Sequence, residues 1–321
     1  MELNAASLVG FRTRYETIFN SAYNLAQPQA DKAAFIFNSG RVEQVIHRWM
    51  QGIGLVREFT DERIAKNLST AGQTIVNRKW ELTVDIEKVA LERDQFGIYD
   101  PFVARMGQVA KLHRDVMVFG GLSDLLTGSS TLLMTVNAYD GQPFYGSHTI
   151  GTQTFNNKTS GSGSVLNFAN LVTAITALRS RKDSAGNTLA AAQAKPLLIV
   201  PPALEFVAAQ LATLSFITGT GPGTGASSAT NQAASTENVL RGTFDYIVSP
   251  YLKTTTEWHV TLADPLYKPM VFQIESEIEF LAPPQFFNNW WSDKDVFRCG
   301  TRALYNAAPG LPELSYGSTG A

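Results

Sequence analysis

The chain has little cysteine and little charge, and each shortage excludes a class of protein. Cys299 is the only cysteine in 321 residues, so an intrachain disulfide and a cysteine-rich metal site are excluded. We interpret Cys299 as a small buried residue of a strand rather than a nucleophile. Charged residues make up 17% of the chain, below the usual share, which predicts that neighbouring molecules cover part of the surface. The net charge of −2 argues against a global basic field for nucleic acid.

No segment has the pattern of a secretion signal or of a membrane helix. The N-terminus lacks a basic stretch followed by an apolar core. The most apolar stretch, residues 197–217, is broken by Pro201 and Pro202 and interrupted by Glu205. We interpret it as a buried strand at 197–200 followed by a helix with Pro202 near its first turn. The sequence therefore predicts a protein without a membrane partner.

The histidines do not form a recognised catalytic or metal-binding motif. They are His47, His113, His148 and His259. None belongs to HExxH or to a paired zinc spacing. Asp140, Ser147 and His148 suggest a fragment of a catalytic triad, but no GxSxG elbow accompanies them and adjacent Ser and His side chains rarely meet. We interpret this segment as a polar loop that closes a turn.

Residues 73–89 show the clearest pattern in the chain, a strict alternation of apolar and polar side chains. The apolar positions are Val76, Trp80, Leu82, Val84 and Ile86. The alternation predicts a strand with one buried face, on the order of 50 Å long. We expect a first strand from near Arg57 and a tip at 69–72, where small residues favour a turn. Such a long hairpin has little to pack on within one compact domain, so we expect it to contact another molecule. This pattern favours an assembling protein over an enzyme.

Three groups of residues are candidates for contacts between subunits. The predicted hairpin supplies Arg57, Arg63, Lys66, Arg78, Lys79 and Trp80. An alternating strand at 270–281 supplies Glu275, Glu277 and Glu279 on one face. An amphipathic helix at 7–25, capped by Ser7, supplies Phe11 and Tyr15. Opposite charges on the hairpin and the strand suggest that neighbouring subunits pair through them, which would set register more than affinity. A solvated face and a cation site remain alternatives for the three glutamates. The aromatic stripe of the helix packs either on its own chain or on a neighbour.

The remaining segments predict a mixed set of helices and strands. Asp100 and Pro101 mark the start of a helix longer than 20 residues, with Asp100 as its cap. We also expect a helix at 166–179, strands at 131–138 and 296–305, a turn at Asp140 and Gly141, a loop at 156–163 and an extended tail from residue 309. Alternating helices and apolar strands through residue 217 predict an α/β subdomain. The low-complexity segment 218–235 lacks the GK[ST] of a phosphate-binding loop, and we predict a mobile loop there.

Three short motifs resemble one known family. They are DGQPFY at 140–145 with His148 after it, LIVPPALE at 198–205, and VSPYL at 248–252 with Trp258 and LAD at 262–264 after it. In this order and spacing they are similar to the major head subunit, or T protein, of Mu-like phages and prophages, within the Hong Kong 97-type capsid superfamily. The resemblance covers essentially the whole chain.

The resemblance implies an α+β fold of the Hong Kong 97 type with a defined layout. The implied parts are an N-terminal arm at 1–50, an extended β-hairpin loop at 51–98 that lies over a neighbour, a peripheral domain with a long spine helix at 99–149 and 265–308, an axial α/β domain at 150–264 with its mobile loop at 218–235, and a C-terminal tail at 309–321.

The resemblance also implies a structural protein without enzymatic activity or cofactors. The chain would be the major capsid protein of a tailed double-stranded DNA bacteriophage, assembling in the bacterial cytoplasm as hexamers and pentamers into an icosahedral virion shell. Its partners would be copies of itself, scaffold, portal and decoration proteins, and packaged DNA through weak non-specific contacts. No long charged coiled-coil prefix is seen, so we expect the scaffold to be a separate protein. Two alternatives remain: a non-viral shell of the same fold that holds cargo enzymes, and a soluble hydrolase that uses His148 or His259.

Overall fold

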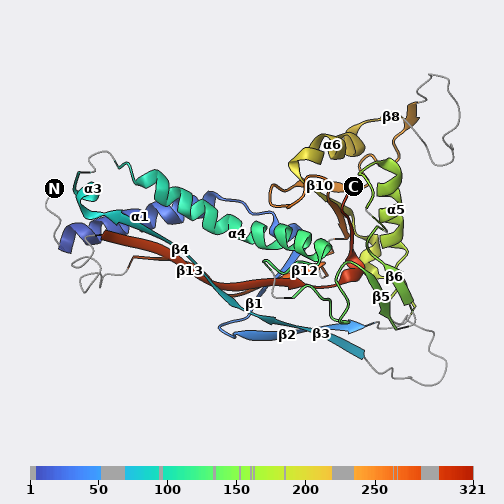
Figure 1. Ribbon diagram of the computed structural model, residues 1–321, viewed down its shortest axis with the longest axis horizontal. Coiled ribbons are helices and arrows are strands. Elements are labelled where there is room, and N and C mark those ends of the chain that lie inside the picture. The colour runs from blue at the N-terminus through green and yellow to red at the C-terminus, as the bar shows by residue number, and fades with distance from the viewer. Residues whose placement is uncertain are drawn as a thin grey trace, which may run out of the picture.

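The chain folds into an elongated lobe joined at one end to a compact lobe (Figure 1). The computed structural model describes residues 5–51, 69–93, 97–132, 135–151, 153–159, 161, 163–183, 186–218, 235–262, 264–265, 267–282 and 296–320. The N-terminus lies at the far end of the elongated lobe and the C-terminus lies in the compact lobe. The expected loop at 218–235 falls almost entirely outside the described residues.

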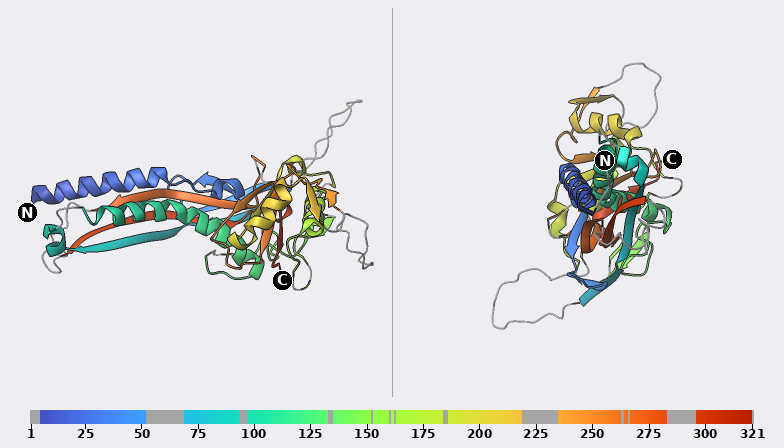
Figure 2. Two further views of the ribbon diagram at one scale, coloured as in Figure 1. Left: turned by 90° about the horizontal axis from the view of Figure 1, so that it is seen from above. Right: turned by 90° about the vertical axis from the view of Figure 1, so that its left-hand side faces the viewer.

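The elongated lobe is a four-stranded sheet with two long helices on one face. Its strands are β1 (Ala34–Asn38), β12 (Met270–Leu281), β13 (Val296–Pro309) and β4 (Arg78–Glu87), in the order β1-β12-β13-β4. Its helices are α1 (Ala5–Leu25), α2 (Ala30–Ala33), α3 (Lys88–Arg93) and α4 (Asp100–Thr127). Helices α1 and α4 pack on each other along the lobe (Figure 2).

The compact lobe is built around a second sheet with the strand order β10-β7-β11-β14. These strands are β7 (Pro196–Val200), β10 (Asp245–Val248), β11 (Trp258–Leu262) and β14 (Ser315–Ser318). The other elements are β5 (Ser147–Ile150), β6 (Gln153–Asn156), β8 (Phe216–Thr218), β9 (Ser235–Glu237), helices α5 (Phe168–Arg179) and α6 (Glu205–Thr213), and 3-10 turns at Ala190–Gln193, Pro202–Leu204 and Pro312–Leu314.

Helix α4 runs 28 residues and confirms the prediction of a long helix from Asp100. The predicted cap is wrong by one residue, because Tyr99 occupies the N-cap position and Asp100 is already helical. The Asp100 carboxylate instead accepts a hydrogen bond from Arg14 of α1 at 2.5 Å. The helix ends at Gly128, whose φ of 73° is the left-handed conformation that glycine tolerates best.

Several apolar clusters fill the described part of the molecule, and one of them extends into both lobes. At the distal end, Tyr15 of α1 packs with Met106 of α4 and Phe297 of β13. Near the compact lobe, Phe119 of α4 shares a cluster with Phe272 and Tyr305 of the sheet and with Ile199 and Ile247 of the second sheet. Helix α4 therefore connects the two lobes through a buried surface. Cys299 is 1% exposed in the distal core, which confirms it as a buried strand residue.

The predicted hairpin is wrong in its pairing. Strand β2 (Gln44–Gln51) pairs with β3 (Ser69–Val76), so residues 69–72 lie in a strand and not at a tip. The expected first strand from Arg57 lies outside the described residues. After Asn77 the chain leaves the hairpin, and β4 pairs with β13 in the main sheet. The alternation over 73–89 therefore belongs to two strands that serve different sheets.

Asn77 fixes the point where the alternating segment divides. Its backbone N–H donates to the Glu43 carbonyl at 2.9 Å, and its side chain donates to the Val42 carbonyl at 3.0 Å. Before it, Ile75 packs on Val271 on one face of the main sheet. After it, the even positions of β4 face α4 on the opposite face of that sheet. The hairpin and α4 thus cover opposite faces, and the hairpin lies below the main sheet in Figure 1.

Three further sequence predictions need correction. The segment 131–138 contains only an isolated bridge between Asn137 and Pro143 within its described residues, not a strand. Helix α1 begins at Ala5, so Ser7 lies inside it and does not cap it. The tail from residue 309 is extended at β14, as predicted, but it is not a separate tail, because β14 pairs with β11 and is buried throughout. None of the described helices is long and apolar enough to span a membrane.

Candidate functional site

The charged residues of the predicted hairpin lie in different environments. Arg57, Arg63 and Lys66 fall outside the described residues. Arg78 donates to the carbonyl of Leu132 at 3.1 Å, and Lys79 is exposed on the face of the sheet turned away from α4. Arg78 is therefore committed to an internal contact, whereas Lys79 remains accessible for a partner.

Trp80 also contacts its own chain. Its indole N–H donates to the carbonyl of Tyr305 at 2.9 Å, and its ring lies 4.8 Å from that of His113 and 6.0 Å from that of Tyr305. Burial lowers the pKa of His113 and raises that of Tyr305. Trp80 joins β4, β13 and α4, so its replacement would disturb the subunit itself.

The three glutamates of β12 do not share one face. Strand β12 has register shifts against β13 around Ser276, which turn successive side chains away from strict alternation. Glu277 reaches the α-helical face, where it pairs with Arg114 and accepts from Tyr23 at 3.4 Å. Glu275 accepts from Asn77 at 3.2 Å, and Glu279 pairs with Arg302 at 3.3 Å. The expectation of a single acidic strip is wrong because β-bulges break the strand's period.

The apolar stripe of the N-terminal helix packs on its own chain. Tyr15 is 1% exposed, and its ring lies 5.9 Å from that of Phe297 on β13. Phe11 lies beside Tyr15, with 6.2 Å between ring centroids, and is half-buried. Of the two alternatives for this stripe, the structure shows docking on the same chain.

The base of the arm is held by a carboxylate of α4. Asp115 is 5% exposed and accepts hydrogen bonds from the backbone N–H groups of Gln29 and Ala30, at 2.8 and 2.7 Å. Burial raises the pKa of Asp115, and these two N–H donors oppose that rise. The contact fixes the elbow between α1 and β1 onto the long helix.

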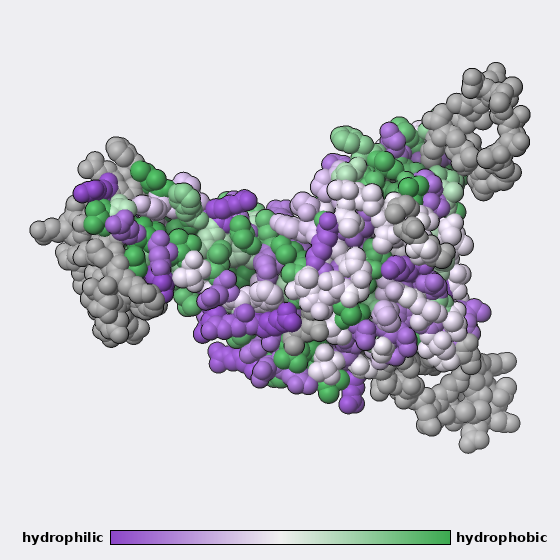
Figure 3. Space-filling model, in the orientation of Figure 1, coloured by the Kyte–Doolittle hydropathy of each residue, from purple (hydrophilic) through white to green (hydrophobic). Residues whose placement is uncertain are grey.

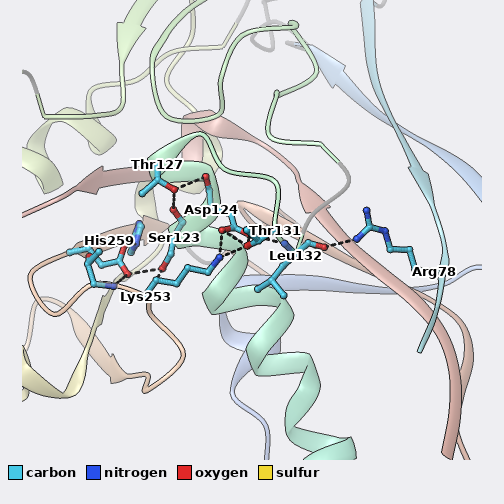
Figure 4. A network of polar contacts seen from close by, with 10 residues as sticks. Arg78, Ser123, Asp124, Thr127, Thr131, Leu132, Lys253 and His259 are labelled. Carbon is cyan, nitrogen blue, oxygen red and sulfur yellow. Dashed lines mark hydrogen bonds and ion pairs between the residues drawn. The ribbon is translucent and has the colours of Figure 1, made fainter. Parts of the chain in front are cut away.

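The C-terminal end of α4 carries a buried polar cluster that connects the two lobes (Figure 4). The Asp124 side chain is fully buried, and its carboxylate accepts from the Thr131 hydroxyl at 2.8 Å, from the Leu132 N–H at 2.9 Å, and from the ammonium of Lys253. Its neighbour Ser123 donates to Glu257 at 2.6 Å. Two adjacent residues of α4 thus anchor the loop 249–257 of the compact lobe.

A second buried cluster lies next to Glu257 on strand β11. His259 Nδ1 lies 2.9 Å from the Tyr145 hydroxyl, which also lies 2.7 Å from the Ser315 hydroxyl of β14. His259 Nε2 and Glu257 Oε2 are 3.9 Å apart, and neither has a hydrogen-bond partner among the described residues. Burial lowers the pKa of His259 to about 4, and Glu257 opposes this only in part. His259 is therefore neutral at pH 7.

Acid is expected to destabilise the chain through His259. In the unfolded chain His259 has its ordinary pKa near 6.5, so it is protonated at a pH where the buried side chain stays neutral. The contribution of neutral His259 to the free energy of unfolding is therefore complete above pH 6.5 and is lost as the pH falls toward 4. Between pH 7 and 5, wild type should lose about 2 kcal/mol of unfolding free energy more than His259→Asn. Denaturant titrations at both pH values measure this, with His47→Asn on the hairpin as the control. Equal losses in wild type and His259→Asn would contradict the assignment.

The C-terminal segment is held by a buried arginine. Arg181 follows α5 and is 5% exposed. Its Nη1 donates to the carbonyls of Pro312, Glu313 and Ser315 at 3.1, 2.5 and 3.0 Å, and its guanidinium lies 4.7 Å from the Phe155 ring. The arginine thus donates to three carbonyls of the C-terminal segment.

The triad fragment does not form a catalytic arrangement. His148 Nδ1 lies 2.7 Å from Asp140, and its Nε2 lies 3.0 Å from the carbonyl of Phe144. Both ring nitrogens therefore face acceptors, which leaves neither free to activate a nucleophile. Ser147 is exposed and His148 is buried, as expected for adjacent residues of a strand. The interpretation of a polar loop holds for residues 139–146, whereas Ser147 and His148 belong to β5. Across the described residues no group of acidic, histidine or cysteine side chains could hold a metal ion.

Sequence reasoning missed Asp115, Asp124, Arg181 and Glu257. Only Asp124 carries a usable signal, because an acidic residue in the last turn of a helix opposes the helix dipole and needs a partner. Asp115 and Glu257 have no local pattern that distinguishes them from exposed carboxylates. Arg181 follows a helix end, where a basic residue ordinarily suits the helix dipole, so its position gives no sign that it binds the C-terminal segment.

The fold is that of the Hong Kong 97-type capsid proteins, which confirms the predicted α+β class. A subunit in the procapsid of bacteriophage JBD30 matches with a TM-score of 0.55 and 18% identity, over 99% of this chain and 76% of that chain. That level of identity supports the fold alone.

Sequence relatives give the family. Residues 8–164 match the family described as Mu-like prophage major head subunit gpT. The major capsid protein of Escherichia phage Mu is 27% identical over 173 residues, covering 54% of this chain and 52% of that protein. The Mu-like prophage FluMu major head subunit of Haemophilus influenzae is 30% identical over 106 residues, covering 33% and 32%. The alignment thus spans about half of the phage Mu protein. The predicted resemblance to the Mu-like major head subunits is therefore confirmed over residues 8–164.

Proposed function

We propose that the chain is the major capsid protein of a tailed bacteriophage and builds the shell of its head from copies of itself. The observation that carries this proposal is the match of residues 8–164 to the Mu-like head subunits. The fold supports it, because an elongated lobe joined to a compact lobe through a shared buried cluster is a shape suited to tiling. In this assignment the elongated lobe is the peripheral domain, α4 is its spine helix, and the compact lobe is the axial domain.

Exposed apolar side chains support self-association. Phe102 at the start of α4 is 65% exposed, and Phe206 on α6 and Phe216 on β8 are 77% and 62% exposed. Figure 3 shows apolar surface along the elongated lobe and over α6. A groove of about 210 Å³ opens beside Phe102 between α4 and β4, lined also by Val84 and Met106. Apolar surface on both lobes is expected of a subunit that neighbours cover on several sides.

The sheet face turned away from α4 is the best candidate for charged contacts between subunits. It carries Lys79 and Glu81 of β4 and Arg298 and Arg302 of β13 around a groove of about 180 Å³. Arg298 pairs with Asp85 through two hydrogen bonds of 2.6 Å. In this proposal the face and the β2–β3 hairpin meet neighbouring subunits, and Lys79 and Glu279 are exposed members of the predicted set.

Assembly as hexamers and pentamers into an icosahedral shell in the host cytoplasm is part of the same proposal. So are a scaffold, a portal, a decoration protein and weak non-specific contact with packaged DNA. The modest negative charge of −2 is consistent with DNA contacts that do not depend on sequence. The shell would be the function, without a catalytic step or a cofactor.

Electron microscopy of the purified chain in negative stain tests the proposal. The chain should form closed shells, or capsomers with fivefold and sixfold symmetry, either alone or when produced with a co-encoded scaffold. The physical reason is the apolar surface left open on both lobes, whose burial drives association. A monodisperse small particle in both preparations would contradict the proposal.

A further inference from the structure

The sheet of the compact lobe has an unpaired edge at β10. In the strand order β10-β7-β11-β14, β10 pairs only with β7, in parallel (Figure 1). The N–H of Ser249 donates to Val200 of β7 at 2.9 Å, so alternate residues Ile247 and Asp245 also face β7. The backbone N–H and C=O groups of Tyr246 and Val248 therefore point away from the sheet. Within the described residues neither has a backbone partner on that side.

A cleft of about 900 Å³ opens beside β10 as far as Ile247 and beside the start of β7. Four consecutive residues from Phe244 to Ile247 line it on one side. The facing walls come from α2 with Asp31 and Lys32, and from Lys195, Pro265 and Lys268, while Leu197 and Ala212 add apolar surface. Tyr246 is 37% exposed beside it. An open strand edge next to a cleft of this size has the form of a site for strand addition.

The charges around the cleft favour an acidic occupant. Lys195 pairs with Asp245 at 2.6 Å, so these two charges compensate each other. The ammonium of Lys268 contacts the backbone carbonyl of Asp31, which leaves its charge uncompensated. Lys32 is exposed and has no ion pair in the described part of the chain. Three ammonium groups thus face two carboxylates, and the excess is positive.

We propose that an extended, acidic peptide segment of a separate protein adds to β10 as an edge strand in this cleft. Its backbone would bond to Tyr246 and Val248, and its carboxylates would pair with Lys32 and Lys268. The chain's own acidic strand at 275–279 does not fit the role, because β12 is already paired inside the sheet of the elongated lobe. The site does not depend on the proposed shell function.

The test compares two substitutions of Tyr246. Tyr246→Pro removes the outward N–H but leaves every hydrogen bond to β7 intact, because that N–H does not face β7. Tyr246→Val keeps the N–H and is the matched control. The probe is a fluorescein-labelled synthetic peptide, Thr-Glu-Val-Glu-Val-Glu-Thr, with a counterpart that has lysine in place of glutamate. Fluorescence anisotropy with the intact chain measures both affinities.

The acidic peptide should bind at least about tenfold more tightly than the lysine peptide. Tyr246→Pro should weaken binding of the acidic peptide at least about tenfold, whereas Tyr246→Val should weaken it less than about threefold. Combined Lys32→Glu and Lys268→Glu should abolish the preference for the acidic peptide, which keeps the proposal testable if Tyr246→Pro fails to fold. Equal binding of both peptides, or no binding, would overturn the proposal. A changed oligomeric state in Tyr246→Pro without peptide binding would also overturn it and would assign the edge to a second copy.

Discussion

Replacing Arg181 by methionine is expected to lower the free energy of unfolding by about 3–5 kcal/mol and to free the C-terminal strand. The three carbonyls that Arg181 satisfies are buried, and an unsatisfied buried acceptor is costly. Burial lowers the pKa of Arg181 to about 10, so its charge is present at pH 7. Burial also raises the pKa of Glu313, and the nearby guanidinium opposes that rise. Methionine would fill the volume but would supply neither donors nor charge.

Denaturant titration and hydrogen exchange measure this effect. Amides of residues 312–318 should exchange faster in Arg181→Met, because the guanidinium donates to the carbonyls of Pro312, Glu313 and Ser315 in this segment. Arg179→Met is the matched control, since Arg179 is exposed in the last turn of the same helix. If the two variants have equal free energies of unfolding and equal amide exchange rates, the C-terminal segment does not depend on Arg181 for its stability.

Local sequence signals predicted the elements that depend on local physics. The helix from Asp100 has a proline in its first turn and a glycine after its last; it starts at the predicted place and is longer than 20 residues, as predicted. The strand at 270–281 has its predicted bounds. In such segments the apolar periodicity and the residues at the ends are enough to predict a helix or a strand, because its secondary structure does not depend on which element packs beside it.

Pairing over long sequence distances could not be predicted. The apolar positions of β4 looked like one arm of a hairpin, yet their partner β13 begins more than 200 residues later. The alternation predicts a strand with a buried face, and it carries no information on which strand lies beside it. Asn77, a single polar residue, separates the two sheets, and its role depends on contacts with Val42 and Glu275.

Buried polar residues were the least predictable part of the site. Ser315 and Ser318 have the composition of an exposed tail, but their hydroxyls bond to Tyr145 and to the carbonyl of Ser164, at 2.7 and 2.8 Å. These bonds permit burial, because a satisfied hydroxyl costs little to remove from water. Their partners come from distant segments, so no spacing in the sequence reveals them.

The Asp124→Asn substitution is expected to lower the free energy of unfolding by about 3–5 kcal/mol. The carboxylate is fully buried and accepts from Thr131, Leu132 and Lys253 together. An amide has one acceptor oxygen where the carboxylate has two, and its NH₂ group would face the hydroxyl and the ammonium as a third donor. Chemical denaturation of the purified chain measures the loss.

The matched control makes the same change at the other end of the same helix. Asp100 pairs with Arg14, but these side chains are 29% and 46% exposed, so Asp100→Asn should cost no more than about 1 kcal/mol. If both substitutions lower the free energy of unfolding equally, the buried Asp124 cluster would stabilise the chain no more than an exposed ion pair does.

A double-mutant cycle with Lys253→Met separates the ion pair from the rest of the cluster. If Asp124 and Lys253 act as a pair, the double variant should be less destabilised than the sum of the singles by more than about 1 kcal/mol. Additive losses would assign the effect to Thr131 and Leu132 alone. The distinction matters for assembly, because Lys253 is the member that belongs to the compact lobe. A coupled pair would mean that the end of the long helix sets the orientation of that lobe, and that shells of the variant should be fewer or misshapen even where the subunit still folds.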